Sequence, residues 1–539
     1  MAGPPQFKQA AKPHSITYRG RRIVRDSLLM VRIAAVAGLG MVVLLAAPFG
    51  IAAGEDRPRI GERPVVERHL NQEAINAGAI SMGELFAHGK LLFAARFNTL
   101  DGQGRPATTG AGAPRIPDEP PWTRIATPHT NSCAGCHYQP RPGGAGDFVA
   151  NAFVGANATD PVTLSLSPKI SMERNTVALH GAGPIEMLAR EMSAEMIAIR
   201  EEARQVALER VEWGEDPMAV YETRDLVAKG VSFGKIRVRG DGKVNPSRIE
   251  GVDWDLIIKA FHQKGAKVSL REFASRAMSL HHGMQAVEKF GADKDPDHDG
   301  YVNELTVGDI TALAIYQAAL ATPGRKMPSH PFVFRVVAQG NRLFSEIGCN
   351  GCHLPELELD DRHFYEPNPY NPTKHALRAE GLGQILKFDM TVQGEKPRLD
   401  PNDGEGAVVR AYTDLKRHNL SDEDYNYFSN EQRPMGTLYG YAKRDSFYNV
   451  PANVNRPNGD FLTARLWFVG NTAPYGHRGD LTMITEAIYH HGGEARVPRD
   501  AFFALNEFDR NAIVAFLKTL QILPPGSNRV IVESRSGRD

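Results

Sequence analysis

Two copies of the pentapeptide Cys-x-x-Cys-His contain every cysteine of this 539-residue chain. The spacing suits covalent haem attachment, because two thiols add to the vinyl groups of one haem and the adjoining histidine reaches its iron. A Cys-x-x-Cys pair also occurs in zinc sites and in redox disulfides. Neither alternative explains a histidine directly after the second cysteine in both copies. The sequence therefore predicts two covalently bound c-type haems and a protein that handles electrons, with these attachment residues and proximal iron ligands: Cys133, Cys136 and His137, and Cys349, Cys352 and His353.

Length and charge set broad limits. A chain this long is expected to form about two to four domains, each with its own core. Lys plus Arg and Asp plus Glu are 63 each, so the formal net charge is zero. No overall field then favours nucleic acid or an anionic membrane surface. We expect no nucleic-acid partner.

The N-terminal segment, residues 1–54, reads as a signal peptide or a membrane anchor. Basic residues including Arg21, Arg22, Arg25 and Arg32 precede an apolar run over residues 33–47, and small residues follow near Ala52. The run is short against the roughly 20 residues that span a bilayer, which favours a cleaved signal over a retained helix. The segment predicts a periplasmic protein, which would be anchored to the inner membrane if the segment were kept.

An internal repeat predicts two similar halves. A glycine and a phenylalanine four residues later precede each haem motif, and a set of mostly apolar positions with identical offsets follows far downstream of each. Offsets of four, four, three and four place those side chains on one face of a helix. The matched elements are Gly89 to Phe93 with Leu305, Asp309, Leu313, Tyr316 and Leu320, and Gly340 to Phe344 with Leu505, Asp509, Ile513, Phe516 and Leu520.

The predicted fold is mainly α, with two cytochrome c-like haem domains in tandem over residues 75–325 and 330–525. A cluster of helix-breaking residues over 321–331 marks the boundary. Long loop insertions are expected over 98–128 and 354–457, a long helix over 185–208, and a small β-hairpin over 231–244.

Several segments together resemble the bacterial di-haem cytochrome c peroxidase superfamily and, within it, the di-haem oxidoreductase family. The haem motif itself is shared by all c-type cytochromes, so the specificity comes from the segments near the C-terminus. The resemblance covers nearly all of the chain after the N-terminal segment. It rests on Asn131 to His137 with Gly143 to Asp147, on Ala411 to Leu415, and on Thr472 to Gly479 running into Glu486 to Glu494.

The resemblance implies iron ligands on the far side of each haem. His491 stands fourteen residues after His477, where the superfamily places the sixth ligand of the second haem, usually methionine. A bis-histidine second haem of lower potential is implied, whereas the alternative is that His491 or His490 only hydrogen-bonds a loop. At the first haem the superfamily's distal position falls on Phe153. That iron is then either open or covered by another residue, with His180, His281, His282 and Met284 as candidates.

Acid–base chemistry at the first haem would need a carboxyl group in a pocket of low polarity. Glu186 lies in a Gly-Pro-Ile-Glu-Met segment that resembles the superfamily's catalytic glutamate loop. Its alternative role is a first-turn residue of a helix. An aromatic bridge between the haems is also implied, and the sequence does not choose among Trp122, Trp213, Trp254 and Trp467.

Residues 293–304 match the first half of a calcium loop. Asp295, Asp297 and Asp299 alternate and are followed by Gly300. Such carboxylates ligate Ca²⁺, and the glycine permits the sharp turn. The twelfth position is Thr306, so the usual bidentate glutamate is missing, although a shorter loop would close with Glu304. The alternative is a solvated acidic turn.

The function implied by the resemblance is a peroxidase-type oxidoreductase. The second haem would accept electrons from a small cytochrome, a cupredoxin or a carrier of the quinone pool, and the first haem would reduce peroxide. Two alternatives stay open. One is a di-haem oxygenase that binds oxygen and acts on an organic substrate, and the other is a cytochrome that only transfers electrons.

Overall fold

The computed structural model describes residues 61–104, 129–150, 173–297, 299–373, 376–430 and 459–533. These ranges contain twelve α-helices and fifteen short strands, and the strands form six small sheets. The architecture is therefore a mixture of helices and small sheets, where the sequence predicted a mainly α fold with one hairpin. Strands of two to four residues account for most of the difference, because so short a strand gives almost no alternation in the sequence.

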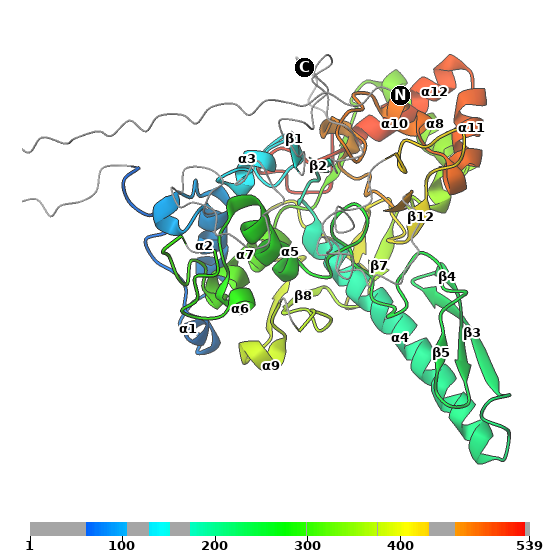
Figure 1. The fold of residues 1–539 in the computed structure, drawn as a ribbon. Helices are drawn as coiled ribbons and strands as arrows, with labels where there is room; N and C mark the ends of the chain where they lie inside the picture. Colours follow the sequence, from blue (N-terminus) through cyan, green and yellow to red (C-terminus); the bar gives the residue numbers. More distant parts are fainter. Residues whose placement is uncertain are drawn as a thin grey trace, which may run out of the picture. The chain divides into compact units, whose positions relative to one another are not determined.

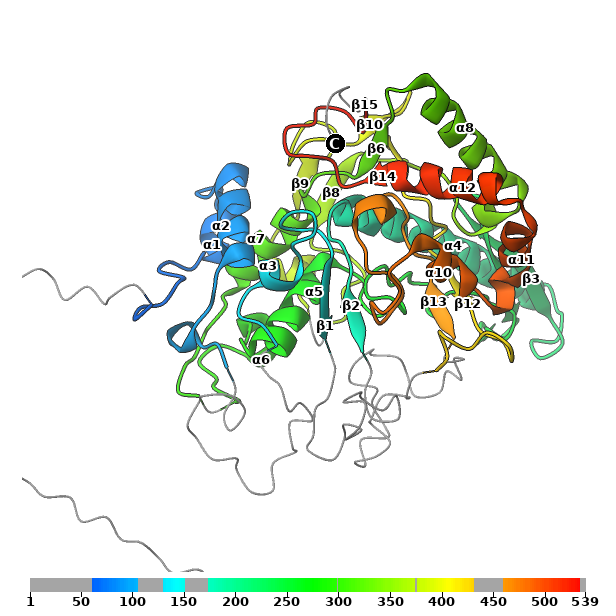
Figure 2. The ribbon, with the colours of Figure 1, turned by 90° about the horizontal axis from the view of Figure 1, so that it is seen from above.

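Two helix pairs form the framework around the haem motifs. In the first half α2 (Met82–Ala94) packs on α7 (Val307–Ala318), and in the second half α8 (Pro331–Glu346) packs on α12 (Glu507–Thr519). Figure 2 shows α8 lying alongside α12. Gly89 and Gly340 stand at the two crossings, where a side chain would collide with a backbone carbonyl of the partner helix. The two helices of each pair therefore cross closely at a glycine in both halves.

Each helix pair presents matched aromatic rings to its haem motif. Phe93 lies 5.4 Å from Tyr316 and 6.3 Å from the ring of His137, centroid to centroid. In the second half Phe344 lies 5.5 Å from Phe516 and 6.4 Å from the ring of His353. The sequence repeat is thus a repeat of structure around the motifs. The chain from Pro58 onward forms one compact unit, and the division into two separate haem domains stays a prediction.

The long predicted helix is α4 (Ala182–Glu212), and its buried stripe includes Leu188, Met192 and Met196. Its C-terminal half runs beside a three-stranded antiparallel sheet (Figure 1). The predicted hairpin is present within that sheet, which consists of β3 (Tyr221–Ala228), β4 (Val231–Arg239) and β5 (Val244–Asn245).

The remaining strands belong to small sheets formed by the loop regions of both halves. In the second half, the region predicted as a loop-rich insertion contains β7 (Leu357–Leu359), β8 (His363–Glu366), β9 (Leu386–Asp389), β10 (Asp400–Pro401), β11 (Ala407–Val409) and β12 (Arg417–Asn419), and β12 pairs with β13 (Asp460–Leu462). β1 (Gly146–Ala150) pairs with β2 (Arg174–Thr176). At the predicted boundary, β6 (Gly324–Met327) pairs with β14 (Leu520–Gln521) and β15 (Ile531–Glu533).

The shorter helices include α1 (Gln72–Asn76), α3 (Cys133–Cys136), α5 (Leu270–Ala277), α6 (Val287–Phe290), α9 (Ala379–Leu382), α10 (Ile484–Tyr489) and α11 (Arg496–Ala504). A π-helical turn, η2 (Met278–His282), continues α5, and a 3₁₀ turn, η3 (Cys349–Gly351), begins the second haem motif. Single π turns often mark functional sites.

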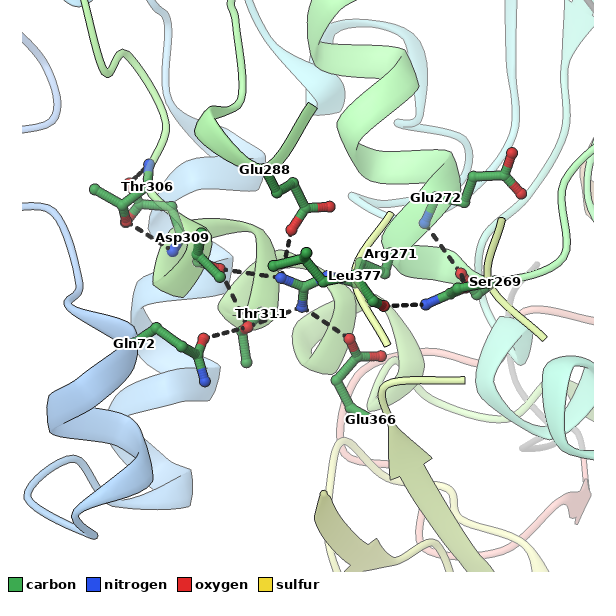
Figure 3. A network of polar contacts seen from close by, with 12 residues as sticks. Gln72, Ser269, Arg271, Glu272, Glu288, Thr306, Asp309, Thr311, Glu366 and Leu377 are labelled. Carbon is green, nitrogen blue, oxygen red and sulfur yellow. Dashed lines mark hydrogen bonds and ion pairs between the residues drawn. The ribbon is translucent and has the colours of Figure 1, made fainter. Parts of the chain in front are cut away.

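A buried ion-pair network holds α5 in place (Figure 3). Arg271 of α5 pairs with Glu288 of α6, and its Nη1 lies 2.9 Å from an oxygen of Glu366 on β8. The same Nη1 donates a hydrogen bond of 2.9 Å to Thr311 of α7. Because Glu366 belongs to the second half of the chain, this network connects the two halves at the base of the helix that leads into η2.

None of the helices in the described ranges is long and apolar enough to cross a membrane. The predicted N-terminal segment, residues 1–54, lies outside the described residues, as do Trp122 and Phe153.

Gly340→Ala is expected to lower the free energy of unfolding by about 1–3 kcal/mol, because a methyl group there meets the carbonyl of Ala512 and forces α8 and α12 apart. Urea unfolding of the whole protein measures the change. Gly83→Ala is the control, since Gly83 lies in α2 where a Cβ meets only the Ser81 hydroxyl, at 3.9 Å. Alanine there favours the helix, so a similar loss in both variants would contradict the crossing.

Candidate two-haem site

Both haem motifs open onto one cavity of about 700 Å³. All six motif residues predicted to attach haem or ligate iron line it, although the two motifs are far apart in the sequence. Apolar side chains make up most of the wall, and several buried histidines and arginines are interspersed among them. The fold therefore brings the two predicted haem sites next to each other.

The motif cysteines are free thiols in apolar surroundings. Burial raises the pKa of Cys133 to about 12, that of Cys136 to about 11 and that of Cys349 to about 12. Among the described residues, no cluster of metal-ligating groups contains cysteines of both motifs; Cys352 with Asp414 and His418 is a group that contains one motif cysteine. A zinc site built from both Cys-x-x-Cys pairs is therefore not formed by the described residues, and covalent haem attachment stays a prediction.

The proximal histidine of the second motif is oriented for iron. The Nδ1–H of His353 donates to the carbonyl of Tyr412 at 3.1 Å, and the ring lines the cavity. Tyr412 has a φ of +55°, an uncommon conformation for a residue with a side chain. Burial lowers the pKa of His353, so the ring is neutral. A hydrogen-bonded Nδ1 and a neutral Nε2 are what an iron-binding imidazole requires.

His491 has the matching arrangement. Its Nδ1–H donates to the carbonyl of Ala487 at 2.7 Å, and its ring lines the cavity. Burial lowers the pKa of His491 to about 4. His353 and His491 thus present neutral rings to the same cavity. His490 does not line the cavity, and its ring packs on Tyr427 at 4.6 Å.

His477 sits in an aromatic cage between the two halves. Its ring lies 4.9 Å from Tyr427 and 5.1 Å from Phe461. Its carbonyl accepts the N–H of Asn175, while the Asn175 side chain donates to the carbonyl of Pro474. The Ala-Pro-Tyr-Gly-His segment thus holds β2 of the first half against the second.

The four residues considered as distal ligands of the first haem differ in whether they line the cavity. His180 is buried between the carbonyls of Ala321 and Pro142, and neither it nor Met284 lines the cavity. His281 and His282 of η2 do line it. The Nδ1–H of His282 donates to the carbonyl of Thr130 at 2.7 Å, and its Nε2 lies 3.5 Å from Sγ of Cys133.

Glu186 lies away from the cavity wall described by the structure. It is buried in the first turn of α4, where its carboxylate accepts hydrogen bonds from the backbone N–H of Leu270 and from the side-chain amide of Asn368. Burial, and next the charge of Glu366, raise the pKa of Glu186 to about 8. The carboxyl is therefore mostly protonated at neutral pH. Its catalytic role stays a prediction.

The tryptophans predicted as possible bridges have different surroundings. Trp213 and Trp254 are 79% and 57% exposed, whereas Trp467 is 1% exposed and packs against Gly181 at the start of α4. Residues on both sides of Trp467 line the cavity. Of the three that the structure describes, only Trp467 has a buried position beside both halves.

Sequence reasoning missed a charged group beside the second motif. His418 donates from Nε2 to Asp414 at 2.8 Å and from Nδ1 to Glu494 at 2.7 Å. Burial opposes a charge on this ring, but the hydrogen bonds to Asp414, Cys352 and Glu494 raise the pKa of His418 to about 11. The two carboxylate partners, Asp414 and Glu494, thus favour the charged form of His418 next to Cys352, a cysteine that is predicted to attach haem. The sequence did contain a signal for this charged group, because Asp414 and Glu494 both lie in the segments that carry the family resemblance.

The donor groups of the cavity fit haem. Two thiols and a histidine lie together at each motif, and His491 offers a second neutral imidazole at the second one. Arg465 lines the cavity, and its Nη1 is buried without a hydrogen-bond partner among the described residues. An unpaired guanidinium facing an apolar cavity suits an anionic ligand group such as a haem carboxylate.

His418→Gln is expected to destabilise the protein more at pH 6 than at pH 9. The pKa of His418 is raised on folding, so its stabilisation is complete below about pH 6.5 and declines as pH rises towards 11. After allowance for solvent screening, the change between the two pH values should be on the order of 1 kcal/mol. Urea unfolding measures it, with His363→Gln as control, since His363 pairs with one carboxylate near the surface. A pH-independent difference would disprove the charged state.

Comparison with known proteins shows only remote likenesses. No family model matches the sequence, and no curated protein matches it. A hydrazine synthase structure from Kuenenia stuttgartiensis is 14% identical, with 89% of this chain and 100% of that chain covered, at a TM-score of 0.33. A MauG-like protein associated with microbial copper homeostasis is 17% identical, with 53% and 76% covered, at a TM-score of 0.23. The functional argument therefore rests on the residues of the cavity.

Proposed function

We propose that the chain is an exported two-haem c-type oxidoreductase that reduces peroxide at the first haem site with electrons received through the second. The observation that carries the proposal is the single cavity lined by both Cys-x-x-Cys-His motifs. Haem, when bound, supplies one-electron chemistry at iron. Two such groups in adjoining sites support transfer between them within one chain.

The residues assign different tasks to the two sites. At the second site His353 and His491 present neutral imidazole rings, which supports a six-coordinate iron without a place for substrate. At the first site His137 is the proximal residue, and burial lowers its pKa to about 4. His282 faces the cysteine edge of that site, and burial lowers its pKa to about 4 as well. A neutral imidazole there can accept a proton from a ligand in the cavity.

Location and partners belong to the same proposal. Haem attachment of this type occurs after export, which supports the periplasmic location predicted from the N-terminal segment. Electrons would come from a small cytochrome, a cupredoxin or a quinone-pool carrier. Calcium remains a separate proposal, supported by the geometry of the acidic loop at residues 293–304.

The test is the low-temperature electron paramagnetic resonance spectrum of the oxidised protein, repeated after about one electron per molecule and then after peroxide. We expect a high-spin ferric signal from the first haem, at rest or on half-reduction, that disappears with peroxide. Two low-spin haems that ignore peroxide would overturn the proposal and leave a cytochrome that only transfers electrons.

A di-haem oxygenase is the second candidate. The observation that favours it is the apolar character of the cavity wall, together with the position of Glu186 outside that wall in the described structure. Oxygen uptake dependent on an apolar organic substrate, without peroxide turnover, would select the oxygenase.

Glu186→Gln is the sharpest test of the predicted acid–base residue. If the carboxyl takes part in proton transfer, peroxide turnover should fall by about 10²–10⁴-fold, the usual contribution of general acid–base catalysis. Gln retains the oxygen that accepts the Leu270 N–H, so folding should persist. Glu395→Gln serves as control, since Glu395 pairs with Arg141 in a partly exposed salt bridge. Full turnover in Glu186→Gln would remove Glu186 from the mechanism.

A further inference from the structure

Three carboxylates converge after α6, in the loop predicted to bind calcium. Ligand oxygens of Asp295, Asp297 and Asp299 lie within 4.8 Å of one another. Glu304 follows in the same loop, and its Oε2 accepts the N–H of Gln285 at 2.8 Å. Like charges held this close are unfavourable unless a cation lies between them.

Three buried oxygen atoms at this cluster lack any hydrogen-bond partner within the described structure. They are Oδ1 of Asp297, Oε1 of Glu304 and Oε1 of Gln285. Asp297 and Glu304 are each 5% exposed, and Gln285 is 7% exposed. An unsatisfied buried oxygen costs about 1–3 kcal/mol, and more when it is charged. Three such atoms in one loop and the residue that its glutamate contacts indicate a missing ligand that accepts lone pairs from oxygen.

The backbone of the loop has the turn conformation that is typical of a calcium loop. Asp295 accepts the N–H groups of Asp299 and Gly300 at 3.1 and 3.0 Å, and Gly300 has a φ of +94°. This is the role that glycine has at the sixth position of a calcium loop. The twelfth-position glutamate is absent, and Glu304 at the tenth position takes its place.

We infer that Asp295, Asp297, Asp299, Glu304 and the side-chain oxygen of Gln285 bind one Ca²⁺, and that this ion braces the turn carrying His281 and His282 at the first haem site. Ca²⁺ accepts six to eight hard oxygen ligands in flexible geometry. Carboxylates and an amide oxygen without nitrogen or sulfur donors suit it better than a transition metal.

Gln285 connects the acidic loop to the turn η2, because it follows His282 by three residues. Oε2 of Glu304 accepts the N–H of Gln285 at 2.8 Å. The carbonyl of His282 accepts the N–H of Gly104 at 3.2 Å. The Glu304 side chain packs against Gly102, only two residues from Gly104. A cation that fixes Glu304 therefore fixes both sides of the backbone that holds His282.

Binding is tested by calorimetry on the full chain with both haems attached, stripped of metal with a chelator. We expect one Ca²⁺ per chain and at least about tenfold weaker Mg²⁺ binding. Asp297→Asn and Glu304→Gln should each weaken Ca²⁺ binding by about tenfold or more. Asp293→Asn removes an exposed carboxylate from the same loop, one that pairs with Asn303, and should leave binding unchanged. Absence of saturable binding by the native protein, or equal weakening in Asp293→Asn, would overturn the site.

The brace is tested on the native protein by adding and removing Ca²⁺ while the electron paramagnetic resonance signals of both haems are recorded. We expect the signal of the first haem to change and that of the second to stay the same. Stoichiometric Ca²⁺ binding with an unchanged first haem would overturn the brace. Neither measurement uses peroxide, so failure here is distinct from failure of the proposed peroxidase activity.

Discussion

His491→Ala is expected to convert the second haem from low-spin to high-spin while the haem stays covalently attached. His491 and His353 present neutral imidazole rings to the same cavity, so removal of His491 leaves the iron without its sixth protein ligand. Electron paramagnetic resonance and the visible spectrum of the oxidised protein report the change.

His491→Met is expected to restore the low-spin state at a higher midpoint potential. A thioether stabilises ferric iron less than imidazole does. The rise should be a sizeable part of the roughly 0.8 V over which axial ligands set haem potentials. Spectroelectrochemical titration of both haems measures it, and only the second haem should move.

His490→Ala is the matched control. His490 is the adjacent histidine in the sequence, but its ring packs on Tyr427 outside the cavity wall. Its removal should leave both haem spectra as they are. If His490→Ala shows the high-spin signal and His491→Ala does not, the ligand assignment is wrong.

The features that the sequence revealed are those with a fixed local spacing. The two haem motifs need only five consecutive residues each, and the helix pairs left a repeat of identical offsets that includes Tyr316 and Phe516. Gly89 and Gly340 occupy matched positions in the same repeat, and a close helix crossing demands glycine at one position.

The features that the sequence concealed depend on contacts between distant segments. Glu186 looks like a catalytic residue in its own segment, yet its partners are Leu270 and Asn368, far along the chain. The charge on His418 arises from Asp414 and Glu494 together. Short strands such as β7 are fixed by pairing with β11 rather than by their own periodicity. Only the folded chain shows which of two roles such residues have.

Arg271→Met is expected to cost about 3–5 kcal/mol of unfolding free energy, the usual penalty for breaking a buried ion pair from one side. Arg271 is fully buried, and its removal leaves Glu288 and Glu366 buried without a cation. Urea unfolding of the whole protein measures the loss.

The triple variant Arg271→Met, Glu288→Gln, Glu366→Gln should recover much of that stability, because most of the penalty belongs to the two stranded carboxylates. Arg342→Met is the control, since Arg342 pairs with Glu346 on the surface of α8 with side chains 64% and 50% exposed. That pair should contribute no more than about 1 kcal/mol. Because α5 continues directly into η2, Arg271→Met should also disturb the spectrum of the first haem more than that of the second. A loss as small as that of Arg342→Met, with both haem spectra intact, would show that the network does not position the first haem site.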